Sequence, residues 1–179
     1  MAGFMEKWRE KRAALVNEGF AAFRKGKELY FAFVKTHGDN YGIGAGDDSL
    51  ASAYDYYLTS LGVAEDEKRF DDVARAHVEL GKICELQGNA HKSVEHRKKA
   101  IELLEAMPQQ KDMDRESIRD SYMFLAISLF HDNEKEEARE VALAGLDKYE
   151  KANDPYGIKP MKTLINNVEN DLNEPIVWN

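Results

Sequence analysis

The sequence lacks the cysteines and the histidine spacing that covalent or metal cross-links need. Its single cysteine, Cys84, excludes an internal disulfide and a cysteine-rich zinc site. No activating neighbour of Cys84 is evident, and its position suits helix packing, so we interpret it as an inert buried thiol. His91 and His96 are five residues apart, on different sides of a helix, and no HExxH pair occurs. We therefore predict no metal and no other cofactor.

Proline and runs of β-branched residues are also scarce. The four prolines lie near places where we expect helices to begin or end, at positions 108, 155, 160 and 175. Alanine, glutamate, lysine and leucine, by contrast, are abundant, and all four have high helix propensity. We therefore predict an all-α fold, and 179 residues suit a single domain spanning 1–179.

Long apolar runs are missing as well. The longest, LYFAFV at 29–34, is far too short to span a bilayer, and the first residues lack the apolar core of a secretory signal, so we expect a cytoplasmic protein. The net charge is −8, but residues 1–35 carry eight Lys or Arg and four Glu, so their net +4 leaves −12 for the remainder. An acidic body argues against nucleic-acid binding, which needs a basic surface.

Apolar residues recur at helical spacing along most of the chain. The pattern predicts a basic, aromatic helical segment over 1–37, a Gly/Asp loop over 38–48, helical hairpins over 49–172 and an irregular tail over 173–179. Gly26 is a candidate break in the first segment. Within the hairpins, helices are expected at about 49–62, 66–87, 89–107, 114–131, 134–151 and 158–172. Asn133 and Glu136 have the spacing of a capping box at one helix start.

The loop contains NYGIGAGDDS, residues 40–49, which resembles a phosphate-binding glycine loop. Such loops join a strand to a helix, whereas the segment before this one has a helical pattern. The Walker pattern and the dinucleotide spacing are absent, and the aspartates do not fit a calcium loop. We therefore predict that the glycines permit a chain reversal and that Asp47, Asp48 or Ser49 caps the following helix.

Two stretches of the chain resemble each other, residues 74–108 and 119–151. The alignment matches these positions: Leu80-Gly81 with Leu125-Ala126, His77 with Tyr122, Cys84 with Leu129, Ser93 with Ala138 and Ala100 with Gly145. Together with LGKICELQGNAHKSVEHRKKAIEL, this pattern resembles the tetratricopeptide repeat family. The copies are 45 residues apart, so the resemblance is to variants with long helices. Arg97 and Ala142 stand where that family usually has a large apolar residue.

The resemblance implies antiparallel helical hairpins stacked as a short right-handed superhelix, with the first helix of each hairpin lining a concave groove. The residues placed in this partner-binding groove are Arg75, Val78, Lys82, Glu85, Asp120, Met123, Ile127 and Phe130. Met123, Ile127 and Phe130 could hold the apolar stripe of a partner helix, and Arg75 and Lys82 could meet its carboxylates. The alternative is that the three apolar residues belong to the core.

The N-terminal segment is apolar enough to need a partner, with Trp8, Phe20, Phe23 and the 29–34 run. It could cap the helical stack, form a homodimer seam or lie on a membrane, and membrane contact is the less favoured reading. We predict a non-enzymatic adaptor that binds a peptide or helix of another protein in the groove. The alternative function is a peripheral assembly or membrane-associated subunit that acts through its N-terminal amphipathic helix.

Overall fold

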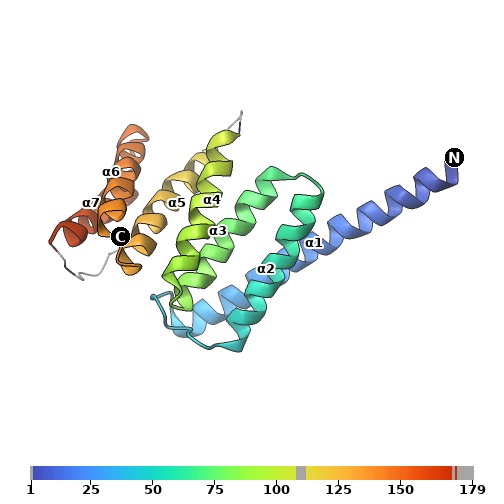
Figure 1. Ribbon diagram of the computed structural model, residues 1–179, viewed down its shortest axis with the longest axis horizontal. Coiled ribbons are helices and arrows are strands. Elements are labelled where there is room, and N and C mark those ends of the chain that lie inside the picture. Colours follow the sequence, from blue (N-terminus) through green and yellow to red (C-terminus); the bar gives the residue numbers. More distant parts are fainter. Residues whose placement is uncertain (1, 108–111, 171, 173–179) are drawn as a thin grey trace. The chain divides into compact units, whose positions relative to one another are not determined.

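The computed structural model describes residues 2–107, 112–170 and 172 of the 179-residue chain. Within these residues it contains seven helices and no strand, which confirms the all-α prediction (Figure 1). The predicted tail at 173–179 and the helix stop at Pro108 lie outside the described residues. The helices are α1 (Ala2–His37), α2 (Asp48–Asp66), α3 (Phe70–Leu86), α4 (Ala90–Ala106), α5 (Asp112–His131), α6 (Lys135–Lys151) and α7 (Pro155–Asn170).

The N-terminal segment is one continuous helix, so the break considered at Gly26 does not occur. Gly26 is buried where α1 lies against α2. A Cβ atom at this position would lie 3.2 Å from both the Ala53 carbonyl oxygen and the Tyr57 ring. Gly26 therefore allows two helices to approach closely, which a helical glycine can do without ending the helix.

Contacts divide the chain into two compact units, Met1–Asn89 (unit 1) and Ala90–Asn179 (unit 2). In unit 1, α1 packs along α2, and α2 packs against α3. In unit 2, each helix from α4 to α7 packs against the next, and α5 also contacts α7. The core of unit 2 is apolar, and its members include Leu129, Tyr149, Met161 and Leu164. The corresponding buried residues of unit 1 include Phe33, Leu50, Tyr57, Leu80 and Ile83.

Four three-residue turns, which join α2 to α3, α3 to α4, α5 to α6 and α6 to α7, share one conformation. The middle residue of each turn has a positive φ: 55° at Lys68, 74° at Gly88, 64° at Asn133 and 52° at Asn153. In each turn the N–H of the following residue bonds five residues back, as in Arg69 to Ala64 at 2.9 Å and Glu134 to Leu129 at 2.9 Å. This Schellman closure satisfies carbonyl groups that the helix end would otherwise leave free.

The expected boundaries of two helices, about 49–62 and 66–87, were wrong beside the turn at 67–69. α2 continues to Asp66, and α3 begins only at Phe70. The capping box predicted from Asn133 is also wrong. Asn133 occupies the left-handed turn position, and the N-cap of α6 is Glu134, which makes no side-chain cap hydrogen bond. Asparagine tolerates a positive φ better than other residues with a side chain, and this tolerance explains its place in the turn.

Lys68 is the one middle residue of these four turns that is neither glycine nor asparagine, so its backbone is strained. We expect Lys68→Gly to stabilise unit 1 by about 1 kcal/mol, because glycine adopts this φ without a steric penalty. Urea unfolding of the two proteins measures the difference. The control removes a glycine from the equivalent position of the α3–α4 turn. Gly88→Ala should lower the free energy of unfolding, since φ is 74° there and the added Cβ would lie 3.3 Å from the Gly42 Cα. Equal or lower stability of Lys68→Gly would contradict the assignment of strain.

Candidate partner-binding surface

The Gly/Asp loop lies against the C-terminal end of α3. The N–H of Gly42 donates to the Glu85 carbonyl and that of Gly44 to the Leu86 carbonyl, both at 2.8 Å. The Tyr41 hydroxyl donates to the Gly88 carbonyl at 2.8 Å. These two glycine amides therefore satisfy carbonyl groups at the end of α3 and do not point at an open anion site. The loop joins two helices, as predicted.

Asp47 caps α2, which is one of the three caps that the sequence offered. Its carboxylate accepts the N–H groups of Ser49 at 2.9 Å and Leu50 at 3.0 Å, as well as the Ser49 hydroxyl. The bond from the Ser49 hydroxyl, followed by that from the Leu50 N–H, lowers the pKa of Asp47 below its usual value. The charged form of Asp47 is therefore the one that holds the start of α2.

The residues aligned between the stretches 74–108 and 119–151 have matching burial. Leu80 and Leu125 are buried, as are the small pairs Gly81 with Ala126 and Ser93 with Ala138, and the pairs Cys84 with Leu129 and Ala100 with Gly145. His77 and Tyr122 are both partly exposed. The left-handed turn residues Gly88 and Asn133 also match at the 45-residue interval. The same interval therefore relates both the burial pattern and the turn.

The four predicted groove residues on α3 have different environments. Arg75 is exposed, whereas Val78 and Lys82 are half-buried. The Lys82 ammonium donates to the Glu79 carboxylate at 2.9 Å, so part of its charge is compensated within α3. Glu85 is half-buried, and its backbone carbonyl accepts N–H groups from Gly42 and Gly88. Arg75 is therefore the most accessible positive charge of the predicted set on this helix.

Glu79 connects Lys82, one of the predicted groove residues, to the interior of unit 1. Sequence reasoning missed this link. The Tyr57 hydroxyl on α2 approaches the second Glu79 oxygen at 3.5 Å, and Tyr57 is 0% exposed. Burial, and secondarily the Glu79 carboxylate, raises the pKa of Tyr57 above its usual value. The Phe23 ring of α1 meets Tyr57 edge-on at 5.3 Å. Glu79 falls three residues before Lys82, and this spacing is the signal that could have indicated the pair.

The predicted groove residues on α5 lie close to the core of unit 2. Met123 is 3% exposed and belongs to the core cluster, and the partly buried Ile127 and Phe130 pack against that cluster. These positions agree with the alternative interpretation, in which the apolar stripe serves packing. Asp120 is half-buried and accepts the Tyr149 hydroxyl at 2.8 Å. Among the predicted apolar groove residues on α5, Ile127 and Phe130 keep part of their surface exposed and Met123 does not.

A second polar cluster joins α5, α6 and α7. Tyr149 lies 2% exposed, with its hydroxyl on Asp120 and the Arg119 guanidinium 5.7 Å from its ring centre. Arg119 also pairs with Asp154 at 3.2 Å, just before α7. Burial, and secondarily the Asp120 charge, raises the pKa of Tyr149 above its usual value. These contacts link three helices that the sequence could not show to be close.

Arg97, which departs from the resemblance noted in the sequence, is 1% exposed. Its guanidinium lies 4.7 Å from the centre of the Phe124 ring, and its Nε donates to the Ser93 hydroxyl at 3.3 Å. Ser93 and Ser128 share a hydrogen bond of 2.9 Å, and Ser128 donates to the Phe124 carbonyl. The α4–α5 interface therefore contains a cation over an aromatic ring and a chain of hydrogen-bonded hydroxyl groups.

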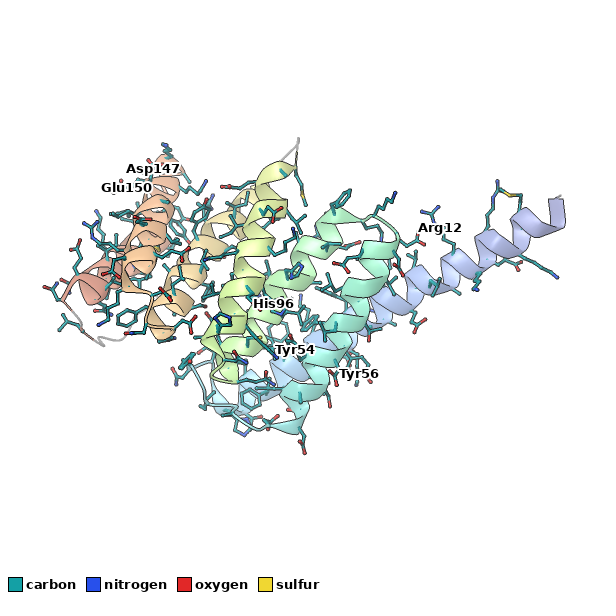
Figure 2. The ribbon with its side chains drawn as sticks, in the orientation of Figure 1. Arg12, Tyr54, Tyr56, His96, Asp147 and Glu150 are labelled. Atoms are coloured by element: carbon teal, nitrogen blue, oxygen red, sulfur yellow. The ribbon has the colours of Figure 1, made fainter. Side chains whose placement is uncertain are left out.

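α1 has a packed part and an exposed part. Phe20 lies under the Arg69 guanidinium at 4.5 Å, and Arg12 pairs with Glu67 beside the α2–α3 turn, where Figure 2 labels it. The described side chains before Arg12 are all exposed, including Met5 at 48%. Trp8 lies in α1, but its side chain is outside the described part of the chain. The packed part agrees with the capping interpretation, and the exposed part is open to a partner.

Across the described residues, no group of three or more His, Cys, Asp or Glu side chains is arranged to bind a metal ion. Cys84 is buried, as the sequence indicated. A helix with the length and apolar character needed to cross a bilayer is not found in the same part of the chain. No protein-family model matches the sequence, and a search of curated proteins gives no match.

Proposed function

We propose that this chain is a protein-interaction module built from tetratricopeptide-like helical hairpins, and that it holds a peptide or helix of another protein. The observation that carries the proposal is the shared burial pattern of residues 74–108 and 119–151. Five aligned positions are buried in both copies, and both copies turn through a left-handed residue at Gly88 and Asn133. Repeat proteins of this kind are built from helical hairpins that repeat the same packing positions.

The face of α3 that carries Arg75, Val78 and Lys82 is the proposed contact surface. Arg75 and Lys82 are seven residues apart, so they lie two turns apart on one side of the helix, and Val78 lies between them. This arrangement fits a partner helix that carries carboxylates on both sides of an apolar residue. The chain as a whole is acidic, and two cations on α3 would help to select this surface for an acidic partner.

The experiment is an affinity pull-down from the native cell's lysate with wild type and the double variant Arg75→Glu/Lys82→Glu. We expect the wild type to retain a partner and the variant to lose it, because both proposed contacts become repulsive. This variant and the control described next should first show wild-type helicity by circular dichroism. The matched control is Lys159→Glu/Lys162→Glu, which makes the same charge change at two exposed positions of α7.

Retention of the same partner by the α3 variant would refute this surface as the site. Loss of the partner by the control as well would show that only net charge matters. Ile127, a predicted groove residue on α5, is a poor choice for such a test, because its side chain packs against the core of unit 2 and its change would disturb folding.

A second candidate function, a peripheral assembly subunit that acts through α1, is favoured by one observation. All described side chains from residue 5 to residue 11 are exposed, and they include the cations Lys7, Arg9 and Lys11. A helix end with exposed side chains is a surface on which another chain can pack.

A further inference from the structure

One face of α1 carries charges of both signs in an order that is complementary to itself. Lys7, Lys11, Leu15 and Glu18 are spaced by four, four and three residues, so they share one side of the helix. All four side chains are exposed, and Leu15 is exposed at 43%. These four residues form a stripe whose side chains are, in order along the helix, positive, positive, apolar and negative.

None of the three charged residues of this stripe has an ion pair or hydrogen bond within the part of the chain that the structure describes. Neighbouring charges on α1 do have partners: Arg12 bonds to Glu67, and Lys25 bonds to Glu28 at 3.2 Å. Figure 1 shows the N-terminal part of α1 extending past the α2–α3 turn, which Arg12 reaches through Glu67. Leu15 and Glu18 come after Arg12 in the chain, and their side chains are exposed as well. Another chain can therefore reach these side chains and pair with their charges.

We propose that two copies of this chain associate through these stripes, with their α1 helices antiparallel about a two-fold axis. Lys7 of each copy then lies against Glu18 of the other, with the axis between residues 12 and 13. A two-fold interface uses the same patch twice, so the patch must be self-complementary, and a stripe with opposite charges at its two ends meets this condition. The order of the charges therefore favours a second copy over an unrelated acidic or basic partner.

The size of the contact sets its strength. Lys7 and Glu18 are about 16 Å apart along the helix, since each residue rises about 1.5 Å. A contact of this length is smaller than a standard protein interface and depends on exposed ion pairs, so the dimer is weak, reversible and sensitive to salt. The two Leu15 side chains flank the axis and lose contact with water when the helices pair.

The test is a charge swap on the full chain, measured by sedimentation equilibrium over a range of protein concentrations at low salt. Lys7→Glu and Glu18→Lys should each weaken self-association at least about tenfold, because each places like charges opposite one another at two symmetric sites. An equimolar mixture of the two variants should associate again. In the mixed dimer, one contact pairs Glu at position 7 with Lys at position 18, and the other keeps the original Lys7–Glu18 pair. High salt should dissociate the wild type.

The matched control is Arg9→Glu, which makes the same charge change two residues from Lys7. Arg9 is nine residues from Glu18 and so lies about 180° away around the helix. We expect it to leave association unchanged. A monomeric wild type at every concentration, a mixture that stays monomeric, or an equal loss with Arg9→Glu would each overturn the proposal. Because purified protein is used and α3 is unaltered, these outcomes are independent of the pull-down result.

Discussion

Gly157→Ala is expected to lower the free energy of unfolding of unit 2 by about 3 kcal/mol. A Cβ on Gly157 would lie 2.0 Å from Cε1 and 2.1 Å from Cδ1 of the Tyr149 ring, which real atoms cannot share. The ring cannot move aside easily, because its hydroxyl bonds to Asp120 at 2.8 Å and Arg119 lies over its face. Either α7 shifts or the Tyr149–Asp120 bond breaks, and both cost more than the helix propensity that alanine gains.

Urea unfolding monitored by circular dichroism measures this effect, and the melting temperature should fall by about 10 °C. Gly62→Ala is the matched control, because Gly62 lies in α2, is exposed and would have no atom within 4 Å of its new Cβ. Gly62→Ala should raise the free energy of unfolding by about 0.5–1 kcal/mol.

The same substitution in a Tyr149→Leu variant tests whether the Tyr149 ring causes the loss of stability. When Tyr149 is first changed to leucine, the aromatic ring is absent, and Gly157→Ala should then cost much less than in the wild type. If the cost is the same in both backgrounds, the steric explanation fails, because residues in direct contact should be energetically coupled.

The helices could be predicted from the sequence because each depends on local signals. Apolar periodicity gave their number and approximate places, and Asp47 before an apolar run indicated the cap of α2. The turn at Lys68 could not be found, since lysine is a good helix former and its side chain gives no signal for the positive φ observed there. Gly26 was ambiguous for a similar reason, because a glycine that breaks a helix and one that lets two helices approach look alike in sequence.

The candidate site was less accessible to sequence reasoning than the helices. A stripe of Met123, Ile127 and Phe130 is equally suited to a groove and to a core, and only the neighbouring helices decide which. The Glu79–Lys82 pair was visible as a spacing, but its link to Tyr57 depends on how α2 packs against α3. The contact of Gly157 with Tyr149 depends on the α6–α7 turn in the same way. Long-range packing, which one sequence does not reveal, therefore determines which polar groups remain open to a partner.

Gly44→Ala is the second large effect, with an expected loss of about 3 kcal/mol in the stability of unit 1. Its Cβ would lie 2.2 Å from the Leu50 Cδ1 and 2.8 Å from the Phe33 Cζ. Leu50 is 0% exposed and Phe33 is 4% exposed, so neither side chain has free space to occupy. If the loop moves outward instead, the Gly44 N–H loses its bond to the Leu86 carbonyl, and a carbonyl at the end of α3 loses its partner.

Gly46→Ala, two residues further along the same loop, separates packing from backbone strain. Gly46 has a φ of 79° and open space around it, so alanine there should cost only about 1 kcal/mol, from strain alone. Urea unfolding of the two variants measures both values. A larger loss for Gly44→Ala means that GIGAG is a packed connection whose glycine spacing serves the core and the end of α3. Equal losses would mean that the loop does not depend on its contact with Leu50, and the assignment of Gly44 to packing would then be wrong.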